Sequence, residues 1–216
     1  MKNIIDIYKE YKIMPILVMH QIRVAAVAMQ ICESLDIDIE LDKENIIKAC
    51  LLHDMGNIIK FNLNNFPEQN KPEGIEYWQT VKDEYISKYG KNEHQASMEI
   101  GKELGISSRI LDLVYCVDSA SVGKIADGDD FSQKVCMYAD GRVTPYGVVS
   151  IEERSMEAKE RYKNHPYAFN EENRLHFNKN LNSIEKQIFS HTKIKPEDIT
   201  DDSIKDYLEK LKSFSI

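Results

Sequence analysis

The sequence places a histidine and an aspartate side by side, His53 and Asp54, at the end of an apolar stretch. The stretch runs from Ile46 to Asn57 and reads IIKACLLHDMGN, with apolar residues at the spacing of a helix that has a wide buried face. A carboxylate is costly to bury unless it is paired or binds a metal. The adjacent pair is therefore a candidate for one half of a metal site.

Two further polar residues share this setting. His20 lies on the apolar stripe of residues 16–35, and Asp140 ends an apolar stretch that begins at Phe131. A lone histidine on such a stripe is more often a hydrogen-bonded core residue than a ligand. However, polar residues on three apolar helices can meet in space, as they do in the metal sites of helical bundles. Because each of these residues should point into the domain, the two halves together could form one site.

The chemistry of this set favours a divalent transition metal or zinc. Two imidazoles and two carboxylates suit Mn, Fe, Ni, Co or Zn, whereas Ca and Mg prefer shells made of oxygen. The separations along the chain are far too long for a zinc finger. The sequence thus predicts a divalent metal ion, of open identity, held by His20, His53, Asp54 and Asp140.

Helical patterns that could position these residues fill most of the chain, and strand patterns are weak throughout. Besides the stretch around His53, helices are predicted at residues 3–12, 15–35, 75–89, 92–104, 108–117, 131–140, 151–163, 181–191 and 201–213. Asp42 and Asn92 are candidate helix caps, and Ser150 with Glu153 forms a capping box. Residues 36–43 and 118–130 are predicted to be loops. The predicted fold class is all-α, with a compact bundle at residues 1–165 and a C-terminal helical extension at 166–216 packed on it.

The composition sets further limits. The 216 residues are 42% hydrophobic, enough for a core, and the net charge of −8 argues against a general nucleic-acid binder. Four cysteines without a CxxC pair favour a reducing cytoplasm. The N-terminus is a poor signal peptide, and no stretch approaches the roughly 18 apolar residues that a membrane span needs. We therefore expect a cytoplasmic protein with no membrane partner.

The order His, His-Asp, Asp on helices resembles the HD-domain superfamily of metal-dependent phosphohydrolases. The segments that carry the resemblance are HQIRVAAVA, LLHDMGN and MYADGRVTPYGVVSIEER. They follow the family's H-x-x-R-V, L-x-H-D-x-G and A-D-x-R patterns in the family's order, over about residues 16–162. The resemblance implies an HD-like helical bundle, a divalent metal on the four ligands, and hydrolysis of a phosphate ester.

One residue departs from the family pattern. Many members carry a lysine directly after the glycine, as HDxGK, whereas this chain has Asn57 there and Lys60 one helical turn later. If that lysine binds a substrate phosphate in relatives, Asn57 cannot supply the charge. The departure puts substrate binding in question more than metal binding.

Three other residues are predicted to contact the substrate. Arg23 and Arg142 lie near proposed ligands and could grip a phosphate through a bidentate fork, or could instead pair structurally with Asp54 or Asp140. In parts of the superfamily an extra histidine before the last aspartate binds a second metal or the substrate, and His94 could do so here; a capping or surface histidine is the alternative. Histidines 165, 176 and 191 lie in polar segments and are predicted to be on the surface.

The predicted activity is hydrolysis of a small phosphate ester, such as a nucleotide, by a metal-activated water. A bound metal lowers the pKa of water to about 7 and polarises a phosphoryl oxygen. His53 and Asp54 are the predicted catalytic residues, with Asp54 also orienting the water. The alternatives are a regulatory module that binds a nucleotide or metal without turnover, and a two-iron oxygenase with a site richer in histidine. The tail could build a homodimer contact.

Overall fold

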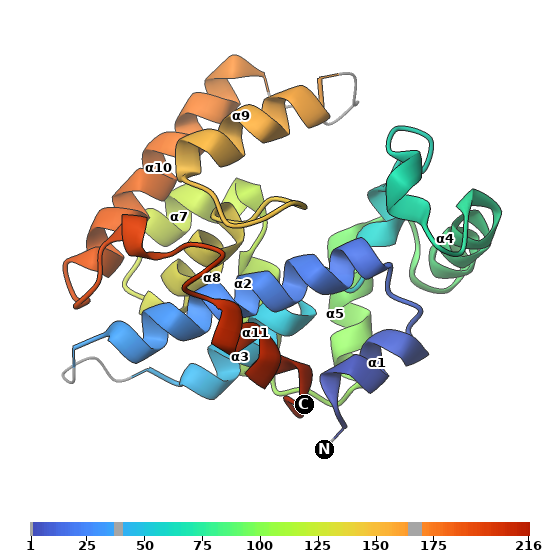
Figure 1. Cartoon of the computed structure of the whole chain (residues 1–216), viewed down its shortest axis with the longest axis horizontal. Helices are drawn as coiled ribbons and strands as arrows, with labels where there is room; N and C mark the ends of the chain where they lie inside the picture. Colours follow the sequence, from blue (N-terminus) through green and yellow to red (C-terminus); the bar gives the residue numbers. More distant parts are fainter. Residues whose placement is uncertain (1, 37–40, 164–169) are drawn as a thin grey trace.

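A computed structural model describes residues 2–36, 41–163 and 170–216 (Figure 1). Within these ranges extended pairing is limited to three isolated bridges, and the predicted all-α fold is confirmed. The helices are α1 (Ile4–Glu10), α2 (Pro15–Ser34), α3 (Lys43–Leu52), α4 (Ile75–Tyr89), α5 (Glu93–Glu103), α6 (Ser108–Cys116), α7 (Val122–Asp127), α8 (Phe131–Gly141), α9 (Ile151–Arg161), α10 (Glu171–Phe189) and α11 (Lys205–Lys212). Short 3-10 turns lie at Asn57–Lys60, Pro67–Asn70, Ser119–Ser121 and Pro196–Asp198.

Helix α2 runs through the middle of the bundle and packs against α3, α8 and α11 (Figure 1). It begins at Pro15, whose fixed φ suits the first turn of a helix. By length and composition α2 could cross a membrane, so it is more apolar than the sequence interpretation stated. Yet Val24, Val27 and Ile31 are fully buried, which is how the core helix of a bundle is built.

The predicted caps are confirmed. Asp42 accepts a hydrogen bond from the backbone N–H of Asn45 at the start of α3, and Asn92 caps α5 in the same way. Ser150 and Glu153 form both bonds of a capping box at α9. Because these caps satisfy N–H groups that the helix leaves open, they fix where each helix begins.

Two predicted boundaries are wrong. Helix α7 lies inside the stretch 118–130 that was predicted to be a loop, because Val122, Ile125 and Ala126 form a short buried stripe among polar residues. Helix α10 begins at Glu171, ten residues before the predicted start at 181. Its first half carries few apolar residues, and Asn170 caps it by accepting a hydrogen bond from the N–H of Asn173.

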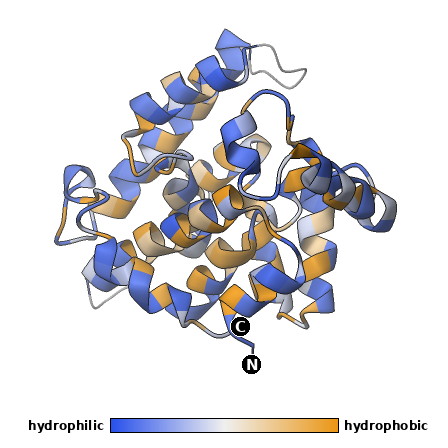
Figure 2. Cartoon of the chain, turned by 45° about the vertical axis from the view of Figure 1, so that its right-hand side comes forward, coloured by the Kyte–Doolittle hydropathy of each residue, from blue (hydrophilic) through white to orange (hydrophobic). Residues whose placement is uncertain are grey.

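The C-terminal helices share the core of the bundle. Leu181, Ile184 and Ile188 of α10 and Leu211 of α11 are buried in the same apolar cluster as α2 and α3. Figure 2 shows apolar residues concentrated in the central helices and hydrophilic residues on the α9–α10 pair at the top. The predicted boundary at residue 165 lies outside the described residues.

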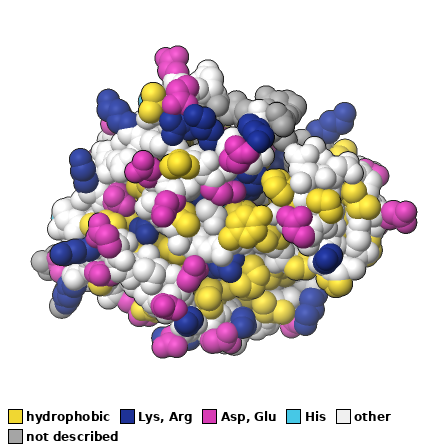
Figure 3. Space-filling model, turned by 45° about the horizontal axis from the view of Figure 1, so that its top comes forward, with side chains coloured by type: hydrophobic (Ala, Val, Ile, Leu, Met, Phe, Trp, Pro, Cys, Tyr) yellow, Lys and Arg dark blue, Asp and Glu magenta, His cyan; other side chains and the backbone are white. Residues whose placement is uncertain are grey.

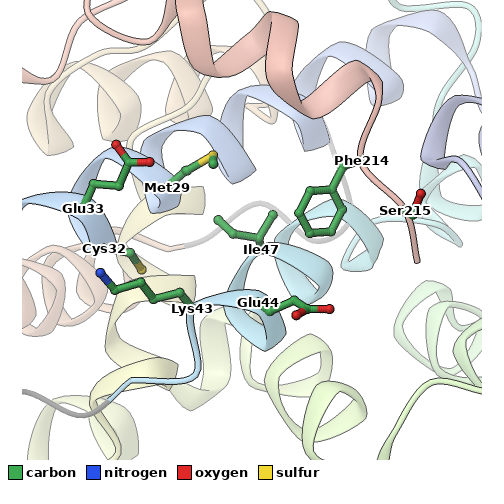
Figure 4. A pocket seen from close by; sticks show the side chains of 8 residues that line it. All are labelled: Met29, Cys32, Glu33, Lys43, Glu44, Ile47, Phe214 and Ser215. Atoms are coloured by element: carbon green, nitrogen blue, oxygen red, sulfur yellow. The ribbon is translucent and has the colours of Figure 1, made fainter. Parts of the chain in front are cut away.

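The C-terminal residues lie against α2 and α3. Phe214 and Ile47 line a cavity of about 380 Å³ together with Met29 and Cys32 (Figure 4). Lys2 and Ile216 exchange backbone hydrogen bonds, so the N-terminal and C-terminal segments lie side by side. The tail therefore closes the face of the bundle formed by these two helices.

Gly56, two residues after Asp54, permits a close approach of helix α5. A Cβ atom at this position would lie 2.3 Å from the carbonyl oxygen of Glu93 and 2.6 Å from the Cβ of Ala96. The Gly56 N–H donates to Ser97 Oγ at 2.9 Å. The glycine is needed here for space rather than for an unusual backbone angle, since its φ is −91°.

We expect Gly56→Ala to lower the free energy of unfolding by about 1–3 kcal/mol, because the added methyl group meets backbone that cannot move freely. Urea denaturation followed by circular dichroism measures this. The matched control is Gly123→Ala in helix α7, where the nearest atom to the new Cβ is 3.4 Å away. Equal stability of the two variants would contradict the close-approach role.

Candidate metal centre

The structure brings the four predicted ligands together. His20 projects from α2, His53 and Asp54 follow the end of α3, and Asp140 lies in the last turn of α8. His20 Nε2 lies 3.0 Å from Asp140 Oδ1 and 3.6 Å from Asp54 Oδ2. His53 Nε2 lies 3.6 Å from Asp54 Oδ1 and 3.5 Å from Asp140 Oδ1. Three helices thus converge on one point.

These separations suit a single ion. Ligand atoms about 2.0–2.2 Å from a metal stand roughly 3–3.5 Å apart at octahedral or tetrahedral angles. The possible ligand atoms of His20, His53 and Asp54 all lie within 4.8 Å of one another. Asp140 is not among these three residues, but its Oδ1 lies 3.0 Å from His20 Nε2 and 3.5 Å from His53 Nε2, so it borders the same point.

The hydrogen bonds of His53 leave one ring nitrogen for a ligand. Its Nδ1 lies 2.8 Å from the carbonyl oxygen of Cys50, and because a carbonyl can only accept, Nδ1 carries the proton. When the ring is neutral, Nε2 therefore holds a lone pair. This atom is buried, and Asp140 Oδ1 and Asp54 Oδ1 lie at the long distances of 3.5 and 3.6 Å from it. An imidazole fixed in this tautomer by a backbone carbonyl is the usual arrangement of a metal-ligating histidine, so the residues fit a metal.

The carboxylates hold a proton on His53 when no metal is present. Burial alone would lower the pKa of His53, but Asp54 and Asp140 outweigh it and raise the pKa to about 9. Burial likewise pushes the pKa of Asp140 upward, but His20 and His53 hold it well below its usual range. A metal and a proton therefore compete for His53.

Residues around the cluster fix the turn that carries it. Gln21, fully buried beside His20, accepts a hydrogen bond from the Asp54 N–H at 3.3 Å. Tyr8 donates its hydroxyl to the Leu51 carbonyl at 2.7 Å. The sequence interpretation missed Gln21, although an amide on the apolar stripe of α2 was a usable signal.

A cavity of about 670 Å³ opens over the cluster, and Lys60 supplies a cation to it. Burial tends to lower the pKa of Lys60, but Asp54, Tyr162, Glu93 and Asp140 raise it above the usual value. Asn57 also lines the cavity. Lys60 thus provides positive charge near the ligands, where Asn57 cannot.

His94 lies on the cavity wall as well. Its Nε2 is 3.8 Å from Glu93 Oε1, and the side chain is 32% exposed. Substrate could therefore reach its ring, and its predicted contact with substrate stays a prediction. His176 and His191 are exposed, as predicted, whereas residue 165 lies outside the described residues.

Arg23 contacts a residue of the cavity wall but does not line the cavity itself. Its NH1 donates to the Pro145 carbonyl at 3.0 Å, and Pro145, not Arg23, is among the residues that line the cavity. Its Nε is buried and has no partner in the described part of the chain. The position fits a residue that holds the turn containing Pro145 more closely than one that touches substrate.

The structure places Arg142 away from the cavity, which does not fit its predicted phosphate contact. Its side chain is buried, and NH1 and NH2 donate to the carbonyls of Pro196 and Ile199, each at 3.2 Å. It also donates to the Val149 carbonyl and the Tyr138 hydroxyl. Arg142 therefore links α8 to the C-terminal segment, and it is not positioned to contact a substrate in the cavity.

Comparison with known proteins agrees with this geometry. The sequence model of the HD domain matches residues 17–124, half of the chain, and the protein belongs to the HD-domain family. The match includes His20, His53 and Asp54, whereas Asp140 lies beyond it and joins them only in the folded structure. Searches of curated proteins and of solved structures gave no match.

We expect Arg142→Met to lower the free energy of unfolding by about 2–4 kcal/mol, because four buried acceptors lose a charged donor. Metal affinity should stay unchanged. The comparison variant is Arg109→Met, which removes a partly exposed ion pair with Asp130 and should cost about 1 kcal/mol or less. Loss of metal affinity with unchanged stability would return Arg142 to the site.

We expect metal binding to release about one proton at pH 7, because His53 must lose its proton before Nε2 can bind. The pKa of about 9 means that the release should vanish, and metal affinity should level off, above that pH. Calorimetric titration of the metal-free protein in two buffers of different ionisation enthalpy measures the release. The same release at pH 7 and pH 10 would contradict the assignment.

Proposed function

We propose that the protein is a metal-dependent phosphohydrolase that acts on a small phosphate ester. The observation that carries the proposal is the buried Nε2 of His53, which lies 3.6 Å from Asp54 and 3.5 Å from Asp140 beside a cavity that Lys60 also lines. A metal-binding cluster alone would serve many purposes. A cluster at the floor of a cavity with a cation beside it suits a phosphate substrate.

The residues of the site would have different roles in such a reaction. His20, His53, Asp54 and Asp140 would hold the ion, which when bound polarises a phosphoryl oxygen and makes a water acidic enough to attack at neutral pH. Asp54, which lines the cavity, would accept a hydrogen bond from that water and orient it. Lys60 and His94 border the same space and would offset charge that develops on the phosphoryl oxygens.

The same geometry supports a second reading, in which the domain binds a nucleotide and metal without turnover. Asn57 in place of the usual lysine keeps this reading open, whereas the charge on Lys60 favours hydrolysis. Metal analysis of the purified protein, followed by phosphate release from a panel of esters with Mn, Co, Ni and Mg, separates the two. Tight metal without phosphate release would favour the binding module, and two irons would favour an oxygenase.

The proposal also includes the cellular compartment and the binding partners of the protein. All four cysteines are free and buried, which suits a reducing compartment such as the cytoplasm. We expect a small phosphorylated partner, such as a nucleotide, rather than a nucleic acid or a membrane. A homodimer stays a prediction, and light scattering of the purified protein tests it.

We expect His53→Ala and Asp54→Asn each to abolish metal-dependent hydrolysis, with a loss of at least about a hundredfold in kcat/KM, and to weaken metal binding. The helical circular dichroism signal should persist, because both side chains lie at a helix end. His176→Ala, an exposed histidine of α10, is the matched control and should hydrolyse normally. Full activity in either ligand variant would refute the proposal.

A further inference from the structure

The cavity over the metal cluster has two unlike walls. One wall holds the acidic ligands, and the other is formed by helices α9 and α10 at the top of the molecule (Figure 1). Figure 3, which brings this top side forward, shows Lys and Arg side chains among carboxylates there. The cations of this second wall that line the cavity are Arg154, Lys159, Arg161, Lys163 and Arg174, with Glu171 as its carboxylate.

The three arginine side chains of this wall are mostly buried, unlike its two lysines. The exposed fractions of the side chains of Arg154, Arg161 and Arg174 are 20%, 15% and 21%, whereas Lys159 and Lys163 are 65% and 57% exposed. A guanidinium that merely solubilises a polar helix stays in water. Because these three face the cavity, their charge acts on whatever occupies it.

Carboxylates do not fully balance this wall. Glu157 pairs with both Arg154, at 3.0 Å from NH1, and Arg161, at 2.7 Å from Nε. Glu171 pairs with both Arg174, at 2.5 Å, and Lys159, at 3.5 Å. Lys163 pairs with Glu160, so three carboxylates serve the five cations of this wall.

One arginine also keeps a free donor. The Nε of Arg154 is buried and makes no hydrogen bond to any part of the chain that the structure describes. A buried donor without an acceptor is costly, by about 1–3 kcal/mol. Arg154 also lines the cavity, so an anionic group there would add charge that its shared carboxylate does not supply.

Lys60 lines the same cavity as the metal cluster and the wall of α9 and α10. Its Nζ lies 3.7 Å from Glu93 Oε1, so a carboxylate already pairs with it. A phosphate at the metal and a second anionic group at the wall would share the cavity with this cation.

We infer that α9 and α10 bind a second phosphate of the substrate, remote from the one that is hydrolysed, and that Arg154 and Arg161 determine this specificity. The inference rests on the proposed function, which supplies the first phosphate. Arginine forks match the geometry of phosphate oxygens, so the substrate class is a small molecule with at least two phosphate groups. The wall lies beyond the residues that match the HD domain.

The first test measures binding without turnover. Pyrophosphate and orthophosphate are titrated calorimetrically into the full-length, metal-free protein in EDTA. We expect pyrophosphate to bind at least about tenfold tighter than orthophosphate, and Arg154→Gln and Arg161→Gln each to lose about tenfold, as one charged hydrogen bond would cost. Lys179→Gln, on the exposed side of α10, is the matched control and should bind normally.

The second test measures preference between substrates in the metal-loaded protein. We expect the ratio of kcat/KM for adenosine 3′,5′-bisphosphate to kcat/KM for p-nitrophenyl phosphate to fall about tenfold in Arg161→Gln, a change of about 1.4 kcal/mol. Arg161→Lys keeps the charge and loses the fork, so it should recover part of this preference. If Arg161→Gln unfolds at a lower temperature than the parent protein, Arg161→Lys still tests the preference.

The outcomes separate the two proposals. Hydrolysis of both substrates with equal binding of pyrophosphate and orthophosphate, or with a preference that Arg161→Gln leaves intact, would overturn the second phosphate site alone. Arginine-dependent binding of pyrophosphate without hydrolysis of either ester would support the anion wall and refute the phosphohydrolase.

Discussion

The fold depends on holding two largely buried carboxylates, Asp54 and Asp140, at the inner end of a cavity in a helical bundle. Isolation of either charge would be costly. Two imidazoles 3.0–3.6 Å away offset that cost, which requires α2, α3 and α8 to converge with their polar ends in register. The buried aliphatic side chains of the same helices make this convergence stable, since they form one continuous core. The same packing of α2, α3 and α8 therefore forms both the core and the site.

The need to hold these carboxylates in place also explains the residues packed around the turn that carries Asp54. Gly56 lets α5 approach the turn after Asp54, and Gln21 holds the backbone of that turn. Helix α9 buries one apolar residue, Ile151, and the first half of α10 buries none. The end of the cavity that holds the metal cluster is accordingly formed by the apolar bundle, and the opposite wall by more polar helices.

Much of the site could be predicted because its residues break the apolar pattern of the helices that carry them. His20, His53 and Asp140 each occupy a position that the helical period assigns to the interior, and the fold class follows from the same period. Arg142 was misassigned because sequence gives the position of a side chain along a helix but not the direction it takes beyond the helix end. Arg154 and Arg161 were missed because a polar helix with many charges has the pattern of a solvated surface, and only the folded chain shows that they face a cavity.

Helix α3 adds a feature that side chains alone do not provide. It ends at Leu52, directly before His53, and its Cys50 carbonyl accepts the proton of that histidine. The carbonyl end of a helix carries a partial negative charge, equivalent to about half an elementary charge. The backbone itself therefore contributes a field that attracts cations and makes the imidazole a better electron donor. Since no substitution of a side chain removes this field, the end of α3 should remain attractive to cations in any variant that keeps the helix.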